Sequence, residues 1–162
     1  MAKGEYESLG VSTIGIDIIP VDVPVHGVKS PVKISFYDTA GQERYRALAK
    51  PYIRGSDAVL LTFCADSPLT RSWYSEIEKD LPENAELFLV CTKIDLDAEG
   101  KVTAGVKTIP EHWHVPEDIG EKVGYVIYNV SSKEGWGIDN LKNDIARKCW
   151  EKDNVIKQIL LK

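Results

Sequence analysis

The sequence predicts an α/β fold in which helices cover both faces of a mostly parallel sheet. Two observations lead to this prediction. Strand-like apolar runs alternate with helix-like segments along the chain, an order that is typical of parallel sheets. Some of these runs, such as 58–63 (AVLLTF), are almost entirely apolar, as expected of strands that are covered on both faces. The 162 residues predict a single domain, 1–162.

The first half of the chain predicts a loop, a hairpin and a short helix. The first fourteen residues are polar and small, and we expect a loop there. Residues 15–25 are rich in Ile and Val and predict a strand, in which Pro20 and Pro24 indicate an edge position. Residues 32–37 alternate between apolar and polar side chains and predict the second, antiparallel arm of a hairpin. A short helix is expected at 44–54.

The second half predicts strands at 58–63, 86–91 and 124–130. A helix is expected at 67–80, where Ser67 is a suitable N-cap and Pro68 suits the first helical position. Another is expected at 137–151, with Ile138, Leu141, Ile145 and Cys149 on one face. The stretch 103–120 is polar and interrupted by proline, and it carries only weak helix signals.

Composition narrows the classes of function. The net charge of −5 gives no support to non-specific binding of nucleic acid. The three cysteines, Cys64, Cys91 and Cys149, are widely spaced and predict reduced thiols in a cytoplasmic protein. The sequence shows no transmembrane stretch, no signal peptide and no terminal cysteine box. We therefore expect a cytoplasmic protein without a membrane anchor.

The most informative motif is 38–43 (DTAGQE), which directly follows a predicted strand. Asp38 would leave the strand end where its carboxylate can reach Mg²⁺, usually through water. Gly41 would let the backbone approach a terminal phosphate closely, and Gln42 would orient an attacking water. The alternative is a turn that happens to contain glycine.

Three shorter motifs also lie next to predicted strands, two of them directly after a strand and the first at the start of one. They are 12–17 (STIGID), 92–95 (TKID) and 131–133 (SSK). Together with DTAGQE and its continuation to Gly55, they resemble the switch and guanine-recognition motifs of small GTPases of the Ras superfamily, most closely the Rab branch. The resemblance covers about residues 6–152. It implies a small-GTPase fold, of the P-loop NTPase type.

The resemblance also implies roles for these motifs. Thr13 would meet Mg²⁺ and the terminal phosphate. Asp95 would accept hydrogen bonds from the guanine ring N–H and its exocyclic amine, and Lys93 would lie along the base. Thr92 stands where the family usually has Asn, although Rho-type members accept Thr there.

The SSK motif resembles the last guanine-binding loop of the family. Ser131 and Lys133 match the usual Ser-Ala-Lys pattern, and Ser132 replaces its Ala. By resemblance, the chain would bind GTP or GDP with Mg²⁺, hydrolyse GTP slowly and act in intracellular signalling or vesicle traffic. Effector or regulator proteins would bind around 12–20 and 38–55.

One expected part is missing from the sequence. The family begins with a strand, a phosphate loop and a helix, but the 162 residues contain no GxxxxGK[ST] motif. In the family, the missing strand lies centrally, between the strands that end here at Tyr37 and Phe63. Three explanations are open: an incomplete chain, a degenerate member of the family, or another segment that fills the vacant position.

Residues 154–162 bear on the third explanation. The preferred prediction is that they extend the last helix. The alternative is that Val155–Leu161, which resembles the apolar first strand of Rab proteins, turns back and fills the vacant position. Two functional alternatives to a GTP switch also stay open: a nucleotide-independent pseudo-GTPase that binds proteins, and a scaffold or dimer paired through exposed sheet edges.

Overall fold

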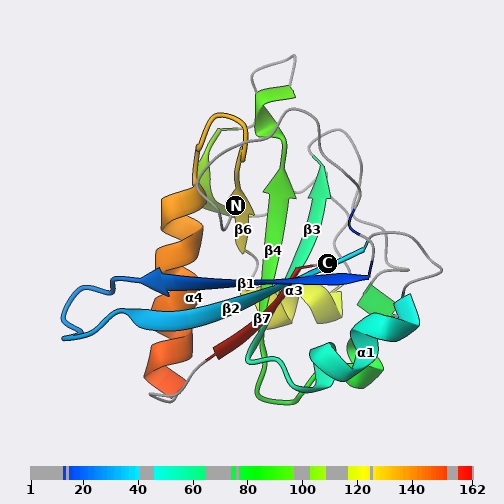
Figure 1. Cartoon of the computed structure of the whole chain (residues 1–162). Helices are drawn as coiled ribbons and strands as arrows, with labels where there is room; N and C mark the ends of the chain where they lie inside the picture. Colours follow the sequence, from blue (N-terminus) through cyan, green and yellow to red (C-terminus); the bar gives the residue numbers. More distant parts are fainter. Residues whose placement is uncertain are drawn as a thin grey trace.

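The computed structural model describes residues 13, 15–40, 46–64, 74, 75, 77–96, 103–108, 117–124, 126–152 and 157–161. Within these ranges, seven strands form one sheet in the order β1-β2-β7-β3-β4-β6-β5 (Figure 1). The strands are β1 (Ile16–Val23), β2 (Val32–Thr39), β3 (Ala58–Cys64), β4 (Glu86–Thr92), β5 (Gly105–Thr108), β6 (Val126–Asn129) and β7 (Lys157–Leu161). The helices are α1 (Arg46–Arg54), α3 (Glu117–Val123) and α4 (Ile138–Lys152), with short 3₁₀ turns η2 (Glu78–Asp80) and η3 (Ile94–Leu96).

The sheet is mostly parallel, as the sequence predicts. Strands β2, β7, β3, β4 and β6 run in one direction, and β1 and β5 run antiparallel at the two edges. The edge position of β1 agrees with Pro20 in the strand and Pro24 directly after it, because proline donates no ladder hydrogen bond. The sequence did not predict β5. Its four residues include Gly and Lys, and a short edge strand needs no apolar run.

The preferred prediction for the C-terminal segment is wrong, and the strand alternative is confirmed. Helix α4 ends at Lys152, and Lys157–Leu161 forms β7 in the middle of the sheet. It pairs in parallel with β2 over five residues and with β3 over three, whereas β2 and β3 do not pair with each other. The physical reason is that a helical extension would leave two facing strand edges with unpaired backbone groups.

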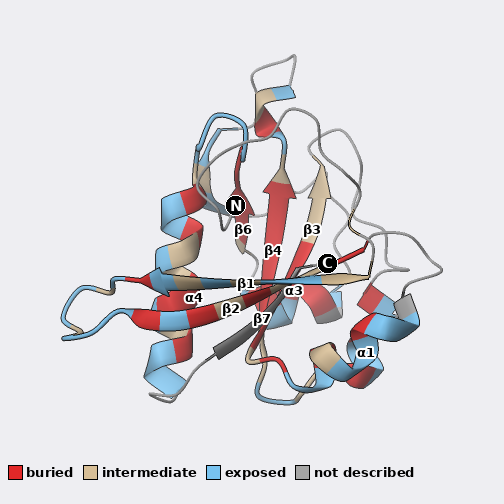
Figure 2. Ribbon diagram, viewed as in Figure 1, coloured by how far each residue is buried: buried red, intermediate tan, exposed pale blue. Residues whose placement is uncertain are grey.

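The core lies in two layers, one on each face of the sheet. On one face, α4 packs Ile138, Leu141 and Ile145 against side chains of β1 to β4 and β6. On the other face, α1 and α3 cover residues such as Val59 and Leu89. Figure 2 shows that β4 is buried along most of its length, whereas β1 is largely exposed or half-buried. The predicted apolar face of the last helix is therefore confirmed.

The predicted helix at 67–80 is described only in part. Tyr74, Ser75 and Ile77 are helical, η2 follows, and residues 65–73 and 76 lie outside the described ranges. Asp80, nearly buried, joins η2 to α1 because Arg54 donates hydrogen bonds to it, with its Nε 2.8 Å from Oδ1. All three cysteines are free, as predicted. None of the described helices is long and apolar enough to cross a bilayer.

Candidate functional site

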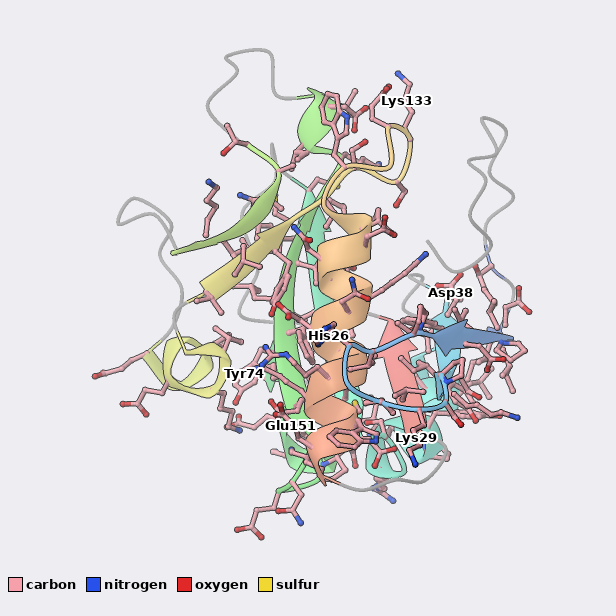
Figure 3. The ribbon with its side chains drawn as sticks, turned by 90° about the vertical axis from the view of Figure 1, so that its left-hand side faces the viewer. His26, Lys29, Asp38, Tyr74, Lys133 and Glu151 are labelled. Atoms are coloured by element: carbon pink, nitrogen blue, oxygen red, sulfur yellow. The ribbon has the colours of Figure 1, made fainter. Side chains whose placement is uncertain are left out.

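The candidate site lies along the edge of the sheet where the parallel strands have their carboxyl ends. Asp38 is near the end of β2, Lys93 directly follows β4, and Ser131 follows β6. Because these strands are parallel, the predicted motifs are brought to one edge, which is where open α/β sheets bind ligands. Strands β7 and β3 separate β2 from β4, so the site consists of two groups of residues. Figure 3 shows Asp38 and Lys133 well apart.

The first group contains the two predicted metal ligands, Thr13 and Asp38. The Thr13 hydroxyl donates a hydrogen bond to Asp38 Oδ2 at 3.0 Å, although the residues are 25 positions apart in the sequence. A second link joins the same segments, since the backbone N–H of Ala40 donates to the carbonyl oxygen of Gly15 at 3.0 Å. A hydroxyl and a carboxylate supply hard oxygen atoms, the ligand type that Mg²⁺ prefers. This pair therefore fits the expected metal.

The second group begins with Lys93, which has an unusual backbone conformation. Its φ is 57°, a left-handed value that costs most residues about 1–2 kcal/mol. The conformation is held on both sides, because the N–H of Leu96 donates to the carbonyl of Lys93 at 2.9 Å, and Ile94 bonds to Val130. The Lys93 side chain is exposed at this edge. Strain at such a position is a feature of functional sites.

Asp95 and Ser131 meet in the same group. The buried Ser131 hydroxyl donates to Asp95 Oδ1 at 2.6 Å and accepts from the backbone N–H of Glu134 at 3.1 Å. These bonds fix the carboxylate of Asp95 across the ends of β4 and β6. Ser132 and Lys133 follow on the exposed turn, where Lys133 Nζ lies 3.6 Å from a carboxylate oxygen of Glu134.

Thr92 is placed differently from the other predicted nucleotide-binding residues. Its hydroxyl donates to the carbonyl oxygen of Phe63 at 2.9 Å and so ties the end of β4 to that of β3. The hydroxyl proton is used within the sheet, so Thr92 could offer a ligand only its acceptor lone pairs. Gly41 and Gln42, the predicted phosphate contact and catalytic residue, lie outside the described residues.

The carboxyl end of β7 lies between the two groups. In the register of the sheet, Leu161 stands beside Asp38 of β2 and Leu60 of β3. A chain that continues past Leu161 would thus leave the sheet next to the candidate metal ligands. The sequence placed this strand end only in its second alternative, because the strand pairing that positions it is not visible in a run of apolar residues.

Comparison with known proteins now identifies the family. The Ras family profile matches residues 1–151. This chain belongs to the Ras family. It is 30% identical to the Xenopus tropicalis Ras and EF-hand domain-containing protein, over 95% of this chain and 22% of that protein. It is 32% identical to human Ras-related protein Rab-15 over 60% of this chain and 47% of the relative, and 26% identical to the GTP-binding protein ypt5 of Schizosaccharomyces pombe over 90% and 67%.

The relatives confirm the predicted Rab-like, Ras-superfamily character of the chain and its α/β fold. The family match assigns the chain to a class of small GTP-binding regulatory proteins, and what this chain itself binds is taken up under the proposed function. The chain spans about a fifth of the length of the Xenopus tropicalis relative and about half of the length of human Rab-15. The activities and partners of those longer proteins are therefore a matter for proposals.

Two residues near the candidate base site were not singled out in the sequence. The carbonyl oxygen of Trp136 accepts from the backbone N–H of Ser131 at 3.0 Å, while its side chain is 48% exposed. Gly137 has a φ of 69°, and a Cβ there would lie 2.4 Å from the carbonyl oxygen of Asn129. This Ras-family chain therefore needs glycine at that position to close its last loop. The Gly-Trp-Gly run at 135–137 is the sequence signal that could have pointed to these two residues.

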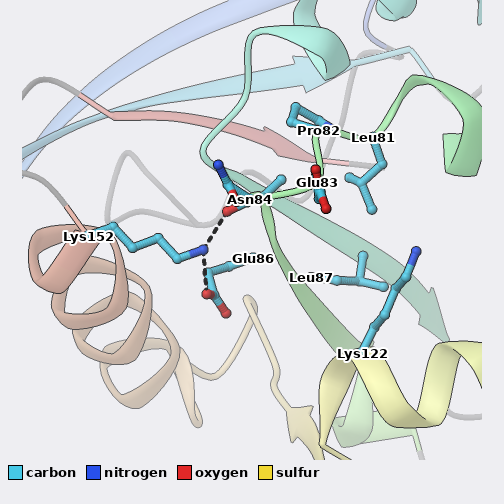
Figure 4. Close-up of a pocket in the computed structure, with 9 residues that line it drawn as sticks. Leu81, Pro82, Glu83, Asn84, Glu86, Leu87, Lys122 and Lys152 are labelled. Carbon is cyan, nitrogen blue, oxygen red and sulfur yellow. Dashed lines mark hydrogen bonds and ion pairs between the residues drawn. The ribbon is translucent and has the colours of Figure 1, made fainter.

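A pocket of about 410 Å³ lies at the opposite edge of the sheet, away from these motifs (Figure 4). Glu86, at the start of β4, meets Lys152 with 2.6 Å between Oε1 and Nζ, and Lys148 at 3.5 Å. Burial raises the pKa of Glu86, but the hydrogen bond and charge of Lys152, helped by Lys148, outweigh it and hold the pKa below its usual value. These two ion pairs, which lie beside the pocket, join helix α4 to the start of β4.

Proposed function

We propose that this protein is a Rab-like guanine-nucleotide switch of intracellular signalling or vesicle traffic. The observation that carries the proposal is the fixed carboxylate of Asp95, held by Ser131 at 2.6 Å beside the strained Lys93. A carboxylate can accept the two N–H donors on one edge of guanine, and adenine lacks that pair of donors. If adenine took the place of guanine, the carboxylate would be buried without its hydrogen-bond donors, which costs about 1–3 kcal/mol. Lys93 would lie along the base, and the Ser132 and Lys133 turn would close over it.

The proposal gives the metal-binding role to Thr13 and Asp38. Their oxygen atoms lie within 3.0 Å of each other, so Mg²⁺ could contact both sides of the pair, directly or through water. When bound, the ion would neutralise phosphate charge. Gly41 would approach the terminal phosphate and Gln42 would orient the attacking water. The 162 residues contain no GxxxxGK[ST] motif, so we assign no phosphate-loop lysine or hydroxyl residue to the phosphates.

Protein partners of such a switch would bind around 12–20 and 38–55. Support comes from the exposed apolar side chains there, since Ile18 on the edge strand β1 and Leu48 on α1 are both about half exposed. The edge of β1 also offers backbone groups for pairing. We place this activity in the cytoplasm.

A second candidate function is a nucleotide-independent pseudo-GTPase that binds proteins through the same surface. Two observations favour it. The Thr13 hydroxyl already donates to Asp38 and the Ser131 hydroxyl to Asp95, so both hydroxyl protons are used within the chain. In addition, the position that the family gives to its phosphate-loop strand is taken here by β7.

Fluorescent GDP binding to the purified chain, with and without Mg²⁺, separates the two candidates. The switch predicts tight binding that Mg²⁺ strengthens, and a loss of about 5- to 100-fold in affinity for Asp95→Asn, which converts one acceptor into a donor. Asp139→Asn, a change at an exposed carboxylate in the first turn of α4, is the matched control and should bind like the parent. No binding at high micromolar protein would reject the switch and favour the pseudo-GTPase.

A further inference from the structure

Strand β5 forms the edge of the sheet opposite β1. Among the described strands only β6 pairs with it, so the backbone N–H and C=O groups of alternate β5 residues point away from the sheet. The other edge strand, β1, contains Pro20 and overlaps the surface already proposed for partners of the switch. Strand β5 contains no proline, so none of its N–H groups is missing. This edge therefore offers donors and acceptors to a further strand.

The two central side chains of β5 lie on opposite faces of the sheet. Val106 is the register partner of Tyr128, which belongs to the core under helix α4, so Val106 lies on the α4 face. Lys107 is the register partner of Ile127, which belongs to the core on the other face. Both side chains are exposed, Val106 to 41%. Lys107 forms no ion pair with any residue in the described part of the chain, so its charge is available to a partner.

A second exposed apolar residue, Trp136, lies close to the start of β5. A Cβ at the next residue, Gly137, would lie 3.4 Å from the backbone nitrogen of Gly105, so the loop that leads into α4 passes beside β5. Trp136 and Val106 are the direct neighbours of the two residues in this contact, and Trp136 is 48% exposed. Aromatic side chains are enriched at protein–protein interfaces. The edge thus combines unpaired backbone groups, two exposed apolar side chains and one lysine.

We propose that β5 binds an extended segment of a partner protein, in which apolar and acidic residues alternate, as a further strand of the sheet. Backbone hydrogen bonds supply the pairing, and the alternation supplies the specificity. An apolar residue of the partner lies beside Val106 on the α4 face, and the acidic residue next to it lies beside Lys107 on the other face. A second copy of this chain lacks that acidic residue, because the only charged side chain of its β5 is also a lysine. This proposal does not depend on nucleotide binding.

The test uses the full chain and a capped, fluorescent peptide of about eight residues in which valine and glutamate alternate. Fluorescence anisotropy should show saturable binding, and amide hydrogen exchange in β5 should slow by about fivefold or more, because pairing protects the outward N–H groups. Lys107→Glu should weaken binding by about tenfold or more, since like charges then face each other. The same variant should instead bind a peptide in which valine and lysine alternate. Because this reversal requires a folded chain, a loss of binding through unfolding would not imitate it.

Lys29→Glu, the same charge change at an exposed lysine of the β1–β2 turn, is the matched control and should leave binding unchanged. Val106→Ser should weaken binding about threefold or more through lost apolar contact. The proposal is overturned if no saturable binding occurs up to about 1 mM peptide, or if the parent binds both peptides equally. It is also overturned if Ile18→Ser on β1 costs as much binding as Lys107→Glu. A chain that runs at twice its 18.1 kDa in gel filtration, with β5 amides protected before peptide is added, would assign this edge to a second copy instead.

Discussion

At the scale of single residues, the backbone of Lys93 connects stability with the proposed function. A lysine with a φ of 57° is strained, and glycine would adopt this conformation without the Cβ penalty. We expect Lys93→Gly to raise the free energy of unfolding by up to about 1 kcal/mol, an effect limited by the greater freedom of glycine in the unfolded chain. Under the proposed function, the same change should weaken GDP binding about fivefold, since a cation next to a ring contributes about 1 kcal/mol.

Urea unfolding and fluorescent GDP titration of the same Lys93→Gly sample measure the two effects. Lys93→Val is the contrasting variant, because a β-branched residue is poorly accommodated at positive φ and should destabilise the chain. If glycine lowered stability as valine does, the left-handed backbone at Lys93 would be refuted. If stability rose and GDP binding stayed unchanged, only the role of Lys93 at the base would be lost.

Glu86 predicts a dependence of stability on pH. Its pKa is lower in the folded chain than its ordinary value of 4.5, because Lys152 and Lys148 favour the charged form. A lowered folded pKa gives stability that is present above about pH 4.5 and is lost as the pH falls through the folded pKa. The lysine side chains are more than a third exposed, so the contribution is about 1 kcal/mol or less.

We therefore expect Glu86→Gln to be less stable than the parent at pH 7, and the difference to shrink below about pH 4. Urea unfolding across this pH range measures it. Glu83→Gln, a change at an exposed carboxylate on the same loop, is the control. A constant difference at all pH values would show that the loss comes from packing and not from the charge of Glu86.

At the scale of elements, the sequence predicted those whose side chains carry a clear pattern. The hairpin, the buried strands near 58–63 and 86–91 and the last helix all appear within a few residues of their predicted bounds. Their patterns record burial on one or two faces, which local sequence can show. Strand β5 lies at an edge, and its exposed Val106 and Lys107 give no such pattern.

The start of α4 provides a prediction at this scale. Gly135 and Gly137 both have positive φ, but only a Cβ at Gly137 would meet a close neighbour, the carbonyl oxygen of Asn129. Gly135→Ala should therefore cost about 1 kcal/mol from its backbone alone. Gly137→Ala adds a clash and should cost about 3 kcal/mol or more, because β6 or α4 has to move. Thermal unfolding followed by circular dichroism compares the two, and equal losses would contradict the close approach.

At the scale of the whole molecule, the sequence showed which motif residues would lie together more readily than it showed the pairing of the sheet that supports them. Thr13 with Asp38 and Asp95 with Ser131 were predicted to share a ligand, and the structure brings each pair together. Each motif lies beside a predicted strand in the sequence, so it could be assigned to one end of that strand from the sequence alone. The pairing of β7 with β2 and β3 joins residues more than 90 positions apart, and apolar composition alone fits a helix as well.

The continuity of the sheet through β7 gives the last prediction. Proline at Ile159 removes an N–H from a strand paired on both sides, so one neighbour loses a ladder hydrogen bond and the gap between β2 and β3 loosens. We expect Ile159→Pro to lower the melting temperature by about 10 °C or more, from a loss of about 3 kcal/mol or more. Ile18→Pro is the matched control. Ile18 is exposed on edge strand β1, two residues before Pro20, so its N–H points the same way as the missing N–H of Pro20. Calorimetry that found both variants equally stable would show that β7 does not hold the two parts of the sheet together.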